Sequence, residues 1–86
     1  MYKLGTTKRF DKALKLCQKR GYPIEKLQNA ISLLVENGML PSEYKPHILH
    51  GNHEGEWEAH IESDWLLIWE QNDTELTLLM LTTGTH

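Results

Sequence analysis

The sequence predicts one α+β domain, residues 1–86, in which two N-terminal helices pack on a small, mostly antiparallel sheet in the order βααββββ. Three observations predict this class. The chain has 86 residues, 40% hydrophobic and 24% charged, as expected for a single globular domain. Apolar residues recur at helical spacing between residues 8 and 37. From residue 47 onward, apolar residues alternate with polar ones or run continuously, as in strands.

The first half contains one short strand and two helices. Residues 2–7 form the expected strand, and Thr7 is a suitable N-cap for the next helix. Gly21 is the expected end of that helix, and Pro23 suits the first turn of a second helix that ends at Asn-Gly 37–38. The two apolar faces consist of Phe10, Ala13, Leu14 and Cys17, and of Ile24, Leu27, Ala30, Ile31, Leu34 and Val35.

The second half is strand-like after a proline-flanked loop at 40–46. Residues 56–62 alternate between apolar and polar, which predicts one buried face. Residues 65–70 are apolar on both faces, as in a central strand, and a hairpin turn is expected at 72–74. Four strands are expected here, at residues 47–52, 56–62, 65–70 and 75–82.

Composition excludes several classes of protein. Cys17 is the only cysteine, so no internal disulfide can form, which agrees with a reducing cytoplasm. No signal peptide or membrane span is expected, because the apolar runs are too short. The net charge of −3 argues against a general polyanion binder, but residues 1–27 carry eight Lys or Arg and two acids, whereas 54–76 carry eight acids and no Lys or Arg.

Four residues at or near strand ends predict acid–base chemistry, namely His47, His60, Asp64 and His86. Antiparallel pairing brings strand ends together, and imidazoles exchange protons near neutral pH. Such a pair suits RNA cleavage by the 2′-hydroxyl group, in which one group removes its proton and another protonates the leaving 5′-oxygen. This chemistry needs no metal or cofactor. Histidines that are only structural or exposed remain the alternative.

Three stretches resemble the YafQ-like branch of the RelE family of bacterial toxins: residues 2–22, 40–69 and 81–86. The most specific parts are His47 before "IL", "AHIESDWLLI" at 59–68 and the closing "TGTH". The resemblance implies a RelE-like microbial ribonuclease fold. It also implies a metal-independent endoribonuclease (mRNA interferase) that acts on mRNA in the 70S ribosome, in the bacterial cytoplasm and without a cofactor.

The same resemblance implies a DinJ-type antitoxin as partner, with DNA contacted only through that antitoxin. Strands that are apolar on both faces agree with a sheet face left for such a protein. On the sequence, the family's acid–base histidines correspond to His47, His60 and His86, and its active-site aspartate to Asp64. The implied substrate-binding positions are Trp65, Thr82 and His50.

Departures from the family pattern predict a weakened toxin. Thr82 stands where the family usually has an arginine, and relatives continue a few residues past His86 to an aromatic side chain. Further departures are Pro46, His50, Glu54 and Trp57. Fewer cations weaken RNA affinity and phosphate stabilisation. A catalytically silent relative that only binds an antitoxin is therefore the alternative function.

Other features also have two interpretations. The tryptophans could stack on bases or belong to the core: Trp57, Trp65 and Trp69. A metal at the histidines near residue 50 is disfavoured, because spacing of three in an extended segment does not place all of them on one face: His47, His50 and His53. The basic helix at 8–20 could contact RNA or be a solvated face.

Overall fold

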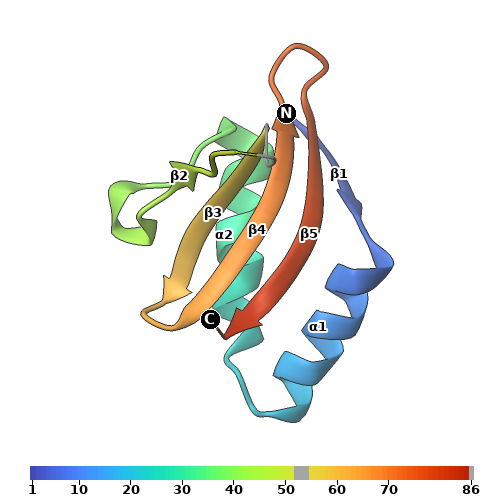
Figure 1. The fold of residues 1–86 in the computed structure, drawn as a ribbon, viewed down its shortest axis with the longest axis vertical. Coiled ribbons are helices and arrows are strands. Elements are labelled where there is room, and N and C mark those ends of the chain that lie inside the picture. Colours follow the sequence, from blue (N-terminus) through green and yellow to red (C-terminus); the bar gives the residue numbers. More distant parts are fainter. Residues whose placement is uncertain (52–54, 86) are drawn as a thin grey trace.

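The computed structural model describes residues 1–51 and 55–85, which form a five-stranded mixed sheet with two helices (Figure 1). The sheet order is β1-β5-β4-β3-β2, with β1 parallel to β5 and the other neighbours antiparallel. The expected α+β class and element order are therefore confirmed. The elements are β1 (Lys3–Thr6), α1 (Lys8–Lys19), α2 (Ile24–Asn37), a 3-10 turn η1 (Ser42–Tyr44), β2 (His47–Ile48), β3 (Glu56–Glu62), β4 (Trp65–Asn72) and β5 (Thr77–Thr85).

Local signals begin and end the helices as expected, except that Pro23 is the N-cap of α2 and not part of its first turn. The hydroxyl oxygen of Thr7 accepts a hydrogen bond from the backbone N–H of Phe10 at 3.0 Å, which caps α1. Gly21 follows α1 with a φ of +78°, and Gly38 ends α2 with a φ of +69°. A Cβ atom on Gly38 would lie 2.5 Å from the ring of Tyr2, so this position needs glycine for space as well as for its backbone angle.

Both helices contribute to one core on one face of the sheet, and Figure 1 shows α2 behind β3 and β4. β4 occupies the middle of the sheet, and Leu66 and Leu67 are buried on its opposite faces, which confirms the expectation of a two-sided strand. Trp69 is a core residue, and Trp57 stacks on it with ring centroids 6.1 Å apart. The core consists of Phe10, Cys17, Leu27, Ala30, Leu34, Leu40, Ala59, Ile61, Trp65, Leu67, Trp69, Leu78 and Met80.

Several strand boundaries differ from the expectation. β2 ends at Ile48, although a strand was expected over 47–52, of which residue 52 lies outside the described part. β5 begins at Thr77 rather than residue 75, because Leu76 has a φ of +56° and belongs to the turn. β5 also continues to Thr85, since the chain pairs with β4 as far as Trp65.

A polar cluster joins the start of β1, the β4–β5 turn and the end of α2. The Tyr2 hydroxyl donates to Asp73 Oδ1 at 2.7 Å. The Gln71 amide donates to the same oxygen at 2.8 Å and to the carbonyl of Gly38 at 2.7 Å. The hydrogen bond from Gln71, followed by that from Tyr2, lowers the pKa of Asp73, and the Asp73 contact raises the pKa of Tyr2.

The lowered pKa of Asp73 predicts an acid-sensitive contribution to stability. This contribution is present above the ordinary carboxyl pKa of 3.8 and is lost as the pH falls through the lower folded-state pKa. We expect Asp73→Asn to reduce the pH dependence of the urea midpoint between about pH 5 and pH 2. Glu75→Gln, an exposed change in the same turn, is the control and should leave that dependence unchanged. Equal slopes for the parent and Asp73→Asn would contradict the assignment.

Candidate active site on the open face of the sheet

Two rows of residues cross the sheet face that lies opposite the helices. In the first row, each residue is the direct partner of the next across adjacent strands: His47 on β2, Glu58 on β3, Ile68 on β4 and Thr82 on β5. The second row consists of His60, Leu66 and Gly84. Neighbouring strands lie about 5 Å apart and alternate residues about 7 Å apart, so these side chains form one continuous surface. His47 and His60 therefore share a face.

His47 contacts two oxygen atoms, one through each ring nitrogen. Nδ1 lies 3.1 Å from the carbonyl oxygen of Lys45, and Nε2 lies 3.1 Å from Glu58 Oε1. The Nδ1–H group can donate a hydrogen bond to the Lys45 carbonyl, and Nε2 forms an ion pair with Glu58 when the ring is protonated. The Glu58 side chain is only 19% exposed, against 48% for His47, and is therefore the more firmly placed partner. Sequence analysis missed Glu58, although the alternation in β3 puts it on the same face as His60.

His60 makes a different contact. Its Nδ1 lies 3.1 Å from the carbonyl oxygen of Ser63, in the turn that follows β3. A carbonyl oxygen only accepts, so Nδ1 carries the hydrogen, and the neutral ring has its lone pair on Nε2. A half-buried imidazole held in this tautomer can accept a proton from a substrate.

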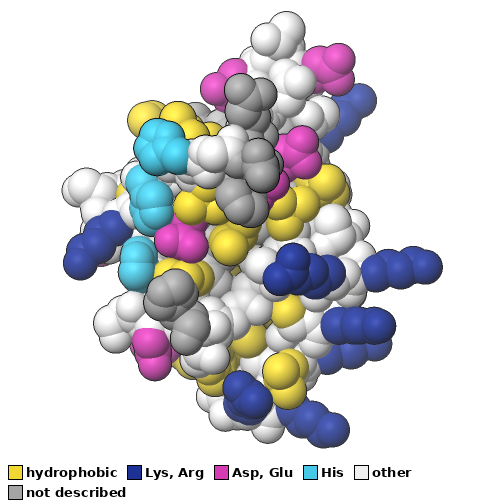
Figure 2. Space-filling model, viewed as in Figure 1, with side chains coloured by type: hydrophobic (Ala, Val, Ile, Leu, Met, Phe, Trp, Pro, Cys, Tyr) yellow, Lys and Arg dark blue, Asp and Glu magenta, His cyan; other side chains and the backbone are white. Residues whose placement is uncertain are grey.

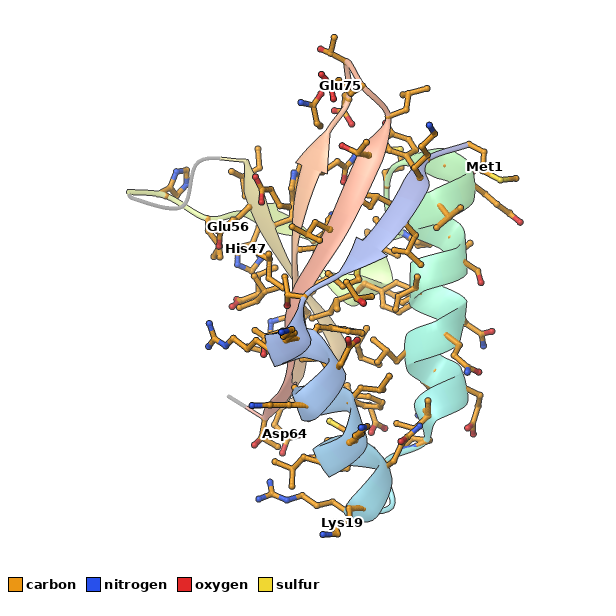
Figure 3. The ribbon with its side chains drawn as sticks, turned by 90° about the vertical axis from the view of Figure 1, so that its right-hand side faces the viewer. Met1, Lys19, His47, Glu56, Asp64 and Glu75 are labelled. Atoms are coloured by element: carbon orange, nitrogen blue, oxygen red, sulfur yellow. The ribbon has the colours of Figure 1, made fainter. Side chains whose placement is uncertain are left out.

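Asp64 and His50, two further expected site residues, lie in exposed segments outside the strands. Asp64 is exposed in the tight turn between β3 and β4, beside the end of β5, and Figure 3 shows it below His47. Among the described residues it makes no hydrogen bond or ion pair. His50 is exposed in the segment after β2. His86 lies outside the described residues, so its expected role remains a prediction.

Trp65 lies on the other face, among the helices. Its ring is 1% exposed and meets Tyr22 edge-on at 4.9 Å. The indole N–H donates to the Thr83 hydroxyl at 2.9 Å, and that hydroxyl donates to the carbonyl of Leu66 at 2.8 Å. Trp65 therefore supports the end of β5 from behind, and its expected role in substrate binding remains a prediction.

Two hollows lie side by side on the open face and share Arg9, Ile68 and Thr82 as lining residues. One, of about 340 Å³, is also lined by Glu58, Leu66, Thr83, Gly84 and Thr85. The other, of about 370 Å³, is also lined by Thr7, Leu49, Glu56 and Leu81. Figure 2 shows histidines and carboxylates on the β2–β3 side of this face, Lys and Arg over α1, and hydrophobic side chains between them.

Clusters of metal-ligating side chains and membrane-spanning helices are both absent from the described part of the chain. Within residues 1–51 and 55–85, no three His, Cys, Asp or Glu side chains lie together so that they could hold a metal ion. His53, one of the three histidines considered for a metal, is outside these ranges. No described helix has the length and apolar character needed to cross a bilayer.

Comparison with known proteins identifies the family. Residues 2–86 match the family described as the bacterial toxin of type II toxin–antitoxin systems, YafQ. The chain belongs to the YafQ toxin family. It is 41% identical over 78 residues to the mRNA interferase toxin YafQ of Escherichia coli K12, covering 90% of this chain and 83% of that protein. The expected resemblance is therefore confirmed.

Solved structures of bacterial toxins share the fold. The E. coli DinJ–YafQ complex matches with a TM-score of 0.91 and 37% identity, covering 100% of this chain and 94% of that one. A metal-bound toxin from Helicobacter pylori matches with a TM-score of 0.90 and 32% identity, covering 100% and 96%. A YoeB/ParE toxin from Agrobacterium tumefaciens, at 19% identity and a TM-score of 0.82, shows the shared fold alone, covering 98% of each chain. The expected RelE-like fold is confirmed.

Proposed function

We propose that this YafQ-family chain is a metal-independent endoribonuclease that cleaves ribosome-associated mRNA and is held inactive by a DinJ-type antitoxin. The 41% identical E. coli relative is named an mRNA interferase, and E. coli YafQ forms a complex with DinJ. The single observation that carries the catalytic proposal is that His60 and the His47–Glu58 pair lie on one face of the sheet, where Glu58 lines a hollow.

The contacts of the two histidines suit two different steps of acid–base catalysis. His60 Nε2 accepts the 2′-hydroxyl proton as the 2′-oxygen attacks phosphorus. The bond between phosphorus and the 5′-oxygen breaks, and the His47 imidazolium gives its proton to that oxygen. The products are a 2′,3′-cyclic phosphate and a 5′-hydroxyl, so the step balances without water or metal. Glu58 pairs with the protonated His47 ring and holds it in place. His86 remains a further candidate for either proton transfer.

Weak activity is part of the proposal. Thr82 presents a neutral hydroxyl where the family pattern has an arginine, and two carboxylates, Glu56 and Glu58, line the two hollows. Negative charge at the site opposes phosphate binding and the charge that develops in the transition state.

The test is to restore the positive charge. We expect Thr82→Arg to raise the rate of cleavage of a ribosome-bound message by about tenfold or more, because one phosphate contact is commonly worth about 10²–10³-fold. Cleavage is mapped by primer extension. Thr74→Arg, which adds the same charge in the exposed β4–β5 turn, is the matched control and should give no gain.

Two further arms test the mechanism. The gain should disappear in His47→Ala and His86→Ala backgrounds, since an acid–base pair acts as a unit. It should persist in EDTA, because no metal takes part. The alternative of a silent relative that binds an antitoxin would be favoured by either of two results. Thr82→Arg gives no gain in rate, or the gain persists after His47 and His86 are replaced by alanine. The apolar part of the open face, Leu66 and half-buried Ile68, suits such a partner in either case.

A further inference from the structure

We propose that Arg9, on the first turn of α1, binds the phosphate group of the RNA that is being cleaved. The inference deepens the proposed function and rests on it. Among the described residues that line the two hollows of the open face, Arg9 is the only Lys or Arg, and it borders both. A phosphate bound beside Ile68 and Thr82 would therefore have Arg9 as the positively charged side chain at its border.

The position of Arg9 is set by its neighbours, although its own side chain is exposed. Thr7 donates through its N–H to the carbonyl of Met80 at 3.1 Å and through its hydroxyl to the carbonyl of Leu81 at 2.9 Å. These bonds join the start of α1 to β5 immediately before Thr82. Phe10 is 3% exposed in the core, which sets the rotation of the first turn. With Phe10 directed inward, Arg9 projects over the open face.

The two sides of the hollow differ in charge, so Arg9 and the His47–Glu58 pair can serve different functions. Arg9 borders the hollow from the α1 side, and Glu58 borders it from β3, where its carboxylate is already paired with His47. Glu56 lines the neighbouring hollow. A phosphate held by Arg9 thus has the proton-donating pair on its other side. The guanidinium group can donate two parallel N–H bonds to two non-bridging oxygens, which positions the phosphorus as well as neutralising charge.

The chemical consequence concerns the non-bridging oxygens. When the 2′-oxygen adds to phosphorus and the bond to the 5′-oxygen breaks, negative charge accumulates on these oxygens. Hydrogen bonds and positive charge directed at them stabilise the transition state more than the ground state. Arg9 therefore acts on the cleavage rate as well as on RNA binding. A neutral side chain at this position should reduce both.

We expect Arg9→Gln to lower single-turnover cleavage of a ribosome-bound message by about 10- to 100-fold, at the low end of the range because the side chain is exposed. Arg9→Lys should retain an intermediate rate, since it keeps the charge without the planar pair of donors. Lys12→Gln and Lys19→Gln remove the same charge from other exposed positions on α1 and should stay within about twofold of the parent. Urea midpoints are measured to check that the variants remain folded.

A second readout does not require catalysis. A trinucleotide with a 2′-deoxy sugar at the cleavage position should shift the backbone amide signals of Thr82 and Gly84 in NMR spectra. Arg9→Gln should weaken this binding several-fold, and Lys12→Gln should not.

The outcomes separate the two proposals. If the parent cleaves RNA but Arg9→Gln behaves like Lys12→Gln in both assays, the role of Arg9 is overturned and the proposed function stands. If the parent does not cleave but the trinucleotide binds in a manner that depends on Arg9, the ribonuclease proposal fails and the phosphate site stands. Binding and cleavage that are both absent overturn both.

Discussion

His60→Ala is expected to lower mRNA cleavage by about 10²–10⁴-fold, because it removes the ring nitrogen that accepts the 2′-hydroxyl proton. The fold should be unaffected, since His60 is half-buried on the open face and, among the described residues, its side chain has one hydrogen bond, to the carbonyl of Ser63. The measurement is the single-turnover rate on a ribosome-bound message, with the urea midpoint as a check on folding.

The control and a double variant sharpen this test. Glu62→Ala lies two residues from His60 on β3 and removes an exposed ion pair with Lys26, which should leave the rate within about twofold. Adding His47→Ala to His60→Ala should cost little more than either change alone, because the two groups serve one proton-transfer cycle. A His60→Ala chain that keeps more than half of the parent rate would remove His60 from the mechanism.

Trp65→Ala should have the largest effect on stability. Its ring is 1% exposed and packs against Tyr22, and truncating a buried tryptophan costs about 3–5 kcal/mol in the free energy of unfolding. A small domain has roughly 5–15 kcal/mol in total, so the variant should be close to unfolding. Trp65→Phe keeps most of the packing but loses the hydrogen bond to Thr83, worth about 1 kcal/mol. Urea denaturation measures both.

The same variants test whether Trp65 contacts the substrate or only supports β5. Leu67→Ala, at a fully buried position on the same face of β4, is a matched core control. If Trp65 only supports β5, cleavage by Trp65→Phe should fall no more than about threefold at a temperature where the variant is folded. A loss beyond tenfold in a folded Trp65→Phe chain, with Leu67→Ala still active, would indicate direct substrate contact.

Much of the fold follows from short-range patterns in the sequence. The spacing of Phe10 and Cys17, together with the cap at Thr7, specifies α1, and Asn-Gly 37–38 ends α2. These signals are visible because a helix satisfies its hydrogen bonds within a few residues. Alternation in 56–62 likewise predicts which residues of β3 face the helices, and so places Glu58 and His60 together.

Tertiary structure decides which strands are neighbours and therefore which residues share the site. The chain shows a histidine at 47 and a threonine at 82, but only the pairing of four strands puts His47, Glu58, Ile68 and Thr82 in one row. The parallel pairing of β1 with β5 brings the start of α1, and with it Arg9, to the same hollow. Register depends on the summed packing of both sheet faces and of the turns, which no local stretch of sequence contains.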